Sequence, residues 1–153
     1  MELTEAKRER LKKLEEVFLE VARNISSKLS QNADLNLTHA QFFMLKRLGA
    51  GPATVSEMAE YMDVSLSAVT SMADRLVKMG YIARKRSEED RRLVWLELTG
   101  PGGVILEETI TKRREILQGM LGRLPEEDLE ALYNVYSKVL SFMSEKKETG
   151  GAV

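Results

Sequence analysis

The side chains best suited to chemistry in this 153-residue chain are a group of small hydroxyls and, shortly after them, a group of cations. The first group, which includes one alanine, is Ser65, Ser67, Ala68, Thr70 and Ser71. The cations that follow are Arg75, Lys78, Arg84, Lys85, Arg86, Arg91 and Arg92. Small hydroxyl side chains can approach base edges or phosphate oxygens closely, and basic side chains neutralise phosphates. Because the net charge of the whole chain is −1, affinity for nucleic acid has to come from this local concentration of cations.

Composition excludes most kinds of reactive site. The chain has no cysteine, which excludes thiol catalysis, disulfides and thiolate metal ligands, and its one histidine, His39, excludes a multi-histidine site within one chain. No nucleophile–base set or phosphate-cradling glycine loop is present, so we expect neither an enzyme nor a bound cofactor or metal. The charged N-terminus and the lack of a long apolar run predict a cytoplasmic protein.

The set of small hydroxyl residues lies on the second of two predicted helices. The first helix spans Val55 to Met62 with Ser56 as its cap, and the second begins at the N-cap Ser65 and ends at Gly80. Apolar residues at helical spacing predict the buried stripe of the second helix, which comprises Leu66, Val69, Met72, Ala73, Leu76 and Met79.

The connection between these helices is the specific part of the pattern. Ala59 is small enough for two helices to cross closely, and Asp63, four residues later, tolerates the left-handed conformation that a tight turn requires. A simple helical hairpin would explain the apolar stripes equally well. It would not explain a short first helix, a tight turn and a face of small hydroxyls together, so the pattern favours a helix-turn-helix.

The cations lie mainly on a predicted β-hairpin. Residues alternate from Ile82 to Arg86 and again from Val94 to Leu98, with a polar tip at 87–90. A basic hairpin beside a helix-turn-helix is a winged helix. A run of charge is usually a solvated surface, but its position on this wing favours a functional interpretation.

Longer helices are predicted on both sides of this module. Thr4–Ser30 carries one apolar stripe, and Thr38 with Gln41 forms a capping box for the helix after it. We expect Gly100–Gly103 to end the wing. Two further helices are predicted, from about Val104 to Leu121 and after Pro125.

The wing carries a resemblance to a known family. Asp90-Arg91-Arg92, the apolar strand that ends in Leu98-Thr99, and Gly102 resemble the wing motif of the multiple-antibiotic-resistance regulator (MarR) family, and Gly80-Tyr81-Ile82 with Arg84 resembles its exit from the recognition helix. Pro101 departs from the motif. The resemblance implies a mainly α fold with a small β-wing, in which N- and C-terminal dimerisation helices flank a winged helix-turn-helix.

The domain organisation follows from this fold. We expect a homodimer, because the apolar stripes of the terminal helices exceed what a small winged helix can cover. The alternative is that these stripes pack within one chain as a bundle. The predicted parts are an N-terminal dimerisation helix (1–34), a winged helix-turn-helix DNA-binding domain (35–99), C-terminal dimerisation helices (100–148) and a disordered tail (149–153).

The resemblance also implies roles for single residues. Arg92 would enter the minor groove of a double-stranded DNA operator, held extended by Asp90. Arg84, Arg86 and Arg91 would meet phosphates. Ser65, Ser67, Ala68, Thr70 and Ser71 would face the major groove, although capping is the main role expected of Ser65. Ser56 would hold a phosphate near a helix start.

Relatives of this kind often respond to small anionic aromatic compounds. Arg23 and His39 are the candidate donors to the carboxylate or phenolate of such an effector. Their ordinary interpretations are an exposed arginine and a histidine near a helix start.

We therefore expect a transcriptional regulator, a repressor, that binds a palindromic operator as a dimer and is released by a small aromatic or phenolic ligand. The alternative is a winged-helix module for protein–protein contact without DNA binding. The paired arginines of the wing favour the first function, because a purely protein-binding module has no need of them.

Overall fold

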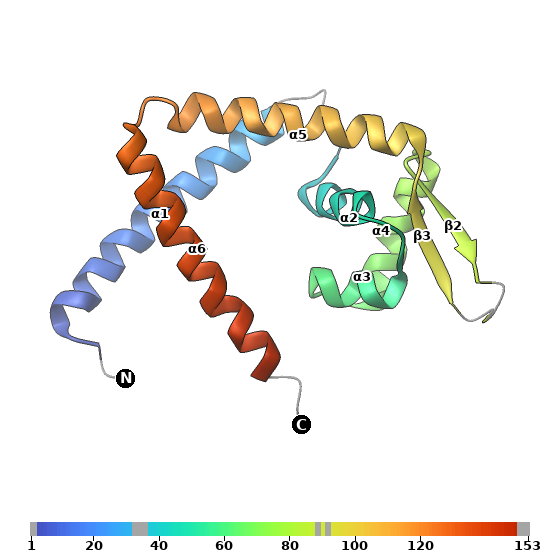
Figure 1. The fold of residues 1–153 in the computed structure, drawn as a ribbon, viewed down its shortest axis with the longest axis horizontal. Coiled ribbons are helices and arrows are strands. Elements are labelled where there is room, and N and C mark those ends of the chain that lie inside the picture. Colours follow the sequence, from blue (N-terminus) through green and yellow to red (C-terminus); the bar gives the residue numbers. More distant parts are fainter. Residues whose placement is uncertain (1–2, 32–36, 88–89, 91–92, 150–153) are drawn as a thin grey trace. The chain divides into compact units, whose positions relative to one another are not determined.

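The structure, a computed structural model, describes residues 3–31, 37–87, 90 and 93–149. The chain divides into two compact units, residues 1–114 and 115–153. Figure 1 shows the elements in chain order, which are α1 (Glu5–Gln31), α2 (His39–Gly49), β1 (Ala53–Thr54), α3 (Val55–Met62), α4 (Leu66–Lys78), β2 (Ile82–Arg86), β3 (Val94–Leu98), α5 (Gly100–Leu121) and α6 (Glu126–Thr149). The predicted class, mainly helical with a small β-wing, is confirmed. None of the helices in the described part of the chain is long and apolar enough to span a membrane.

The hydrophobic core lies under the helix-turn-helix and the sheet. Its buried side chains come from α2, β1, α3, α4, both hairpin strands and the start of α5. The fully buried large residues include Met44, Leu45, Met58, Leu76 and Leu96. This core holds α4 against the sheet, and so it places the small hydroxyl residues of α4 next to the wing.

The caps of α2 and α3 are both capping boxes. The predicted box of α2 is confirmed, because Thr38 Oγ1 accepts from the Gln41 N–H and the Gln41 side chain accepts from the Thr38 N–H. The predicted cap of α3 was wrong by two residues. Thr54 is the cap and forms its box with Glu57, whose pKa is lowered by the hydrogen bonds from Thr54. Ser56, the predicted cap, lies in the first turn instead.

The turn between α3 and α4 has the predicted conformation. Asp63 has φ 55° and ψ 47°, and the Val64 N–H donates to the carbonyl of Ala59 at 3.1 Å. Ala59 is buried, as its small size predicts. The predicted cap Ser65 is also confirmed, since its hydroxyl accepts from the Ala68 N–H at 3.2 Å.

The buried face of α4 is shorter than predicted. Val69, Ala73 and Leu76 are completely buried, but Leu66 at one end and Met79 just beyond the other are exposed. The helical period identified the stripe correctly. It could not identify where the core beneath the helix ends.

The sheet has three strands in the order β1-β3-β2, all antiparallel. The predicted hairpin is confirmed, with Ile82 opposite Leu98 and Arg86 opposite Val94. Strand β1, two residues long, pairs Ala53 with Leu96 and was not predicted. A two-residue segment carries no alternation that the sequence could reveal.

The start of α5 corrects another expectation. Residues 100–103 do not end the wing but form the first turn of α5. The Thr99 hydroxyl accepts from the Gly102 N–H at 3.1 Å and donates to the Gly80 carbonyl at 2.6 Å. Gly102 is needed here for close packing, because a Cβ atom on it would lie 1.9 Å from the carbonyl oxygen of Tyr81. Pro101 is tolerated because first-turn N–H groups have no partner within the helix.

Candidate nucleic-acid interface

The exposed face of α4 is made of small side chains. Ser65, Ser67, Ala68, Thr70 and Ser71 are all exposed in the structure. Two of the hydroxyls are already engaged, since Ser65 Oγ and Ser67 Oγ lie 3.0 Å apart and Ser65 also caps the helix. Thr70 and Ser71 follow on the same helix, and both are exposed.

Arg84 ties the wing to this helix. One guanidinium nitrogen bonds the carboxylate of Asp74, and Nη2 donates to the backbone carbonyl of Thr70 at 3.2 Å. The guanidinium therefore faces α4, although the sequence suggested a phosphate contact. The arrangement has two effects: it neutralises the carboxylate of Asp74 beside the hydroxyl face, and it fixes the angle between β2 and α4.

The other described cations of the wing, Lys85 and Arg86, are both exposed. Lys85 lies 3.9 Å from the carboxylate of Glu97 on the neighbouring strand. Arg86 is exposed at the end of β2. At the tip, the backbone N–H of Asp90 donates to Ser87 Oγ at 3.2 Å. Arg91 and Arg92 lie outside the described residues, and so does the proposed pairing of Asp90 with Arg92.

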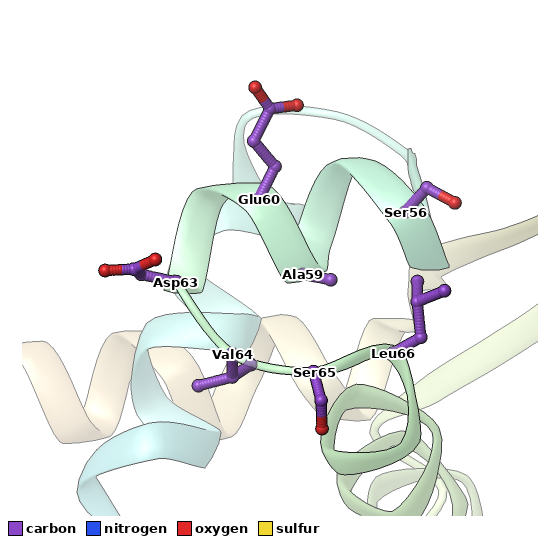
Figure 2. Close-up of a pocket in the computed structure, with 7 residues that line it drawn as sticks. All are labelled: Ser56, Ala59, Glu60, Asp63, Val64, Ser65 and Leu66. Carbon is purple, nitrogen blue, oxygen red and sulfur yellow. The ribbon is translucent and has the colours of Figure 1, made fainter. Parts of the chain in front are cut away.

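An open hollow lies between the start of α3 and the start of α4. Its volume is about 600 Å³, and it is lined by Ser56, Ala59, Glu60, Asp63, Val64, Ser65 and Leu66. In Figure 2 Leu66 rises from the start of α4 toward the α3 end that carries Ser56, while Asp63 lies at the far side of the hollow. The uncharged end of the hollow is therefore the end at which both helices begin, next to the hydroxyl face of α4.

A second polar cluster joins α2 to α5. His39 at the start of α2 accepts a hydrogen bond at Nδ1 from Arg113 Nη2 at 3.4 Å, because arginine can only donate. The guanidinium carbon of Arg113 lies 3.9 Å from the ring centroid of Phe42. Burial and the nearby charge of Arg113 lower the pKa of His39, and burial lowers the pKa of Arg113.

Arg113 is a half-buried cation whose hydrogen bonding is incomplete. Its Nε atom is buried and has no hydrogen-bond partner within the described residues. The other predicted effector residue, Arg23, forms an exposed ion pair with Glu20 one helical turn away. His39 is thus paired with Arg113, a residue that the sequence analysis did not select.

Two residues, Arg113 and Leu66, were misjudged from sequence for different reasons. Arg113 stands in a run of charged residues, Lys112 to Glu115, but it follows Leu106 by seven residues, and this helical spacing was the available signal that it faces inward. Leu66 was assigned to the core because it fits the helical stripe. Its place directly after the cap was the available signal, since first-turn side chains often extend beyond the core.

Comparisons with known proteins agree with this geometry. The MarR family model matches residues 37–94. The chain is 40% identical over 104 residues, 67% of each protein, to the HTH-type transcriptional repressor MdtR of Bacillus subtilis. It is 33% identical over 113 residues, 73% of this chain and 76% of the relative, to the organic hydroperoxide resistance transcriptional regulator of the same organism.

Solved structures share the fold over nearly the whole chain. A MarR family protein from Bacillus stearothermophilus superposes with a TM-score of 0.79 at 27% identity, covering 90% of this chain and 97% of the other. A mutant of Escherichia coli MarR complexed with operator DNA gives a TM-score of 0.71 at 28% identity and covers 86% and 96%. With a winged helix whose exposed helix and basic hairpin lie together, and with relatives of this similarity, the chain belongs to the MarR family of DNA-binding transcriptional regulators.

Proposed function

We propose that this protein is a repressor that binds a palindromic duplex operator as a homodimer and releases it when a small aromatic anion binds. The observation that carries the DNA-binding part is the small hydroxyl face of α4 beside a basic hairpin on one rigid core. Repression is supported by the relative MdtR, which is described as a repressor.

The two terminal helices support a dimer. In the single chain, α1 exposes Leu14, Val17 and Phe18 on one face, and α6 exposes Tyr133, Leu140 and Met143 on one face. Apolar faces of this length are rare on monomers and mark association surfaces. A second copy of the chain is the simplest partner, because a two-fold interface buries the same face on both subunits.

A two-fold dimer predicts the operator. Its two α4 helices enter successive major grooves on one side of the duplex, so half-sites lie about 10 base pairs apart, centre to centre. Arg86, Arg91 and Arg92 displace counterions, so binding weakens steeply as salt concentration rises. In this arrangement Ser56 faces the DNA backbone from the start of α3.

The test combines mass and site selection. Sedimentation equilibrium is expected to give twice the chain mass at micromolar concentration. Selection from random duplexes is expected to enrich an inverted repeat. A folded monomer would contradict the dimer, and binding that is indifferent to sequence and to salt would contradict the operator.

Release by an anion is supported by the cluster at the start of α2. A half-buried cation whose buried Nε has no partner among the described residues can gain a carboxylate or phenolate as its partner. His39 lies beside it, and the Phe42 ring offers an apolar surface. An anion there releases DNA only if it prefers the arrangement of the two α4 helices that does not fit the operator.

Titration of salicylate into a fluorescent operator complex tests this part. Millimolar salicylate is expected to weaken the complex, and Arg113→Gln and His39→Gln are expected to blunt the effect. Arg23→Ala is the matched comparison, because Arg23 was predicted from sequence but pairs with Glu20. An unchanged response in Arg113→Gln would remove this cluster from the mechanism, with operator binding left intact.

The alternative function is a winged helix that contacts another protein and no DNA. The Arg84–Asp74 pair makes this alternative less suitable. Arg84 neutralises the carboxylate of Asp74 beside the small hydroxyl residues, so that face of α4 does not repel a polyanion. Absence of any sequence-selected duplex, together with a stable complex with a protein partner, would favour the alternative.

A further inference from the structure

Leu66 is an exposed leucine at the tip of the helix proposed to read DNA. It is the first residue of α4 and keeps 54% of its surface exposed, whereas Val69, Ala73 and Leu76 of the same helix are completely buried. Its side chain therefore contributes little to the core. A single exposed leucine needs no explanation by itself, but this one stands at the end of α4 that would enter the groove.

The hydroxyls next to Leu66 are partly engaged within the helix. The Ser65 hydroxyl caps the helix by accepting from the Ala68 N–H, and it also lies within hydrogen-bond distance of the Ser67 hydroxyl. Beside these hydroxyls, the large apolar group that this end of α4 offers to a partner is the side chain of Leu66. The hydroxyls of Thr70 and Ser71 lie further along the helix.

From this arrangement we propose that Leu66 determines specificity by contacting the 5-methyl group of thymine in the major groove. The proposal rests on the proposed function, in which α4 enters that groove. Residues at the start of a recognition helix are the ones that reach base edges. Thymine is the one base that presents an apolar group there, so an apolar tip selects thymine.

The position of Leu66 fits this role. It stands at the uncharged end of the hollow between α3 and α4, beside Ser56, and away from the acidic end at Asp63 (Figure 2). Asp63 repels phosphates, whereas Ser56 and Leu66 carry no charge, and the carboxylate of Glu57, the residue after Ser56, accepts hydrogen bonds from Thr54.

The competing explanation is structural. In it Leu66 stabilises the tip of α4 by resting against the start of α3 across the hollow, and has no part in base choice. Truncation would then reduce stability and would weaken binding to every duplex equally. The two explanations differ in one measurable quantity, the dependence of affinity on the thymine methyl group.

The test replaces single thymines of the selected operator by deoxyuridine, which removes only the methyl group. For the wild-type dimer, at least one symmetric pair of replacements is expected to weaken binding about fourfold per thymine, the equivalent of roughly 0.8 kcal/mol for one buried methyl. In Leu66→Ala and in Leu66→Gln the same replacements are expected to have no effect. Leu66→Gln keeps the length of the side chain and good helix propensity, so a loss of the methyl effect cannot come from unfolding.

Val77→Ala is the matched control, because Val77 is an exposed apolar residue at the other end of the same helix. This variant is expected to keep the full deoxyuridine penalty. A wild-type protein indifferent to every replacement, or a penalty that persists in both Leu66 variants, would overturn the role of Leu66 while leaving operator binding established. Failure to select any operator would instead overturn the proposed function.

Discussion

At the scale of single residues, the wing tip carries the first prediction. Arg92, which lies outside the described residues, is expected to enter the minor groove, where a planar cation meets a negative potential. Arg92→Ala should weaken operator binding by roughly 1–3 kcal/mol with the fold intact. Asp90→Ala should cost less, because Arg92 remains. Fluorescence anisotropy measures both, and wild-type affinity in folded Arg92→Ala would remove the wing tip from recognition.

His39 gives a prediction about pH. Its pKa is lowered below 6.5 in the folded protein by burial and by Arg113, so the unfolded chain takes up its proton first as the pH falls. A state that binds more protons gains on acidification, so His39 reduces the free energy of unfolding below about pH 6.5. This penalty is absent above that pH and is complete once the pH lies below the folded pKa.

His39→Gln should remove the penalty. Urea unfolding at about pH 7.5 and about pH 5.5 should show the wild type losing more stability than the variant on acidification, given the ordinary histidine pKa. An equal loss of the free energy of unfolding in both proteins would mean that groups other than His39 cause the loss of stability at low pH.

At the scale of elements, the pair formed by Arg84 and Asp74 connects the wing to α4. Because Arg84 neutralises Asp74, Arg84→Ala should expose a carboxylate to the operator and weaken binding by about 1 kcal/mol or more, as expected for the loss of one charged partner. Removing the acid as well, in Arg84→Ala with Asp74→Ala, should restore part of the affinity. A direct phosphate contact predicts no such recovery and a salt dependence lower by about one charge.

The double-mutant cycle measured at two salt concentrations separates these outcomes. Arg86→Ala is the matched comparison, since Arg86 is an exposed arginine on the same strand. The operator affinity lost in Arg86→Ala should not be recovered when Asp74→Ala is added. Equal losses in the single and double Arg84 variants would show that the pairing with Asp74 does not matter for DNA binding.

The junction between the wing and α5 depends on a glycine. Gly102 lies so close to Tyr81 that any side chain there would collide with the backbone. Gly102→Ala should lower the free energy of unfolding by about 1–3 kcal/mol, the usual cost of overpacking. Gly103→Ala is the control, because a Cβ atom there meets nothing within 4 Å. Similar denaturation midpoints for the two variants would contradict this account of the motif.

At the scale of the whole molecule, operator binding should depend on dimerisation. Leu140→Glu places a charge in the exposed apolar stripe of α6, whereas Asn134→Glu places one on the opposite side by the helical period. The first variant should dissociate the dimer and reduce operator affinity strongly while α4 and the wing stay folded. The second should leave both unchanged. Sedimentation and anisotropy report mass and affinity, and a dimeric Leu140→Glu variant would place the interface elsewhere.

The sequence by itself determined the elements whose residues interact locally. The turn at Asp63, the caps at Thr38 and Ser65, and the hairpin from Ile82 to Leu98 were all predicted and confirmed. Each of these features depends on residues a few positions apart or on the alternation of residues along a strand, so the sequence pattern itself specifies the local structure. The family resemblance in the wing had the same local origin.

Only the tertiary structure decided which side chains meet across elements. It turned Arg84 toward Asp74, placed the guanidinium of Arg113 over the Phe42 ring, left Leu66 outside the core and required glycine at position 102. Arg84, Arg113 and Gly102 each meet a residue of another element. Leu66 lies where the core beneath α4 ends. Residue type and spacing are the same whether an arginine faces phosphate or a carboxylate, so the choice depends on how the helices and strands pack.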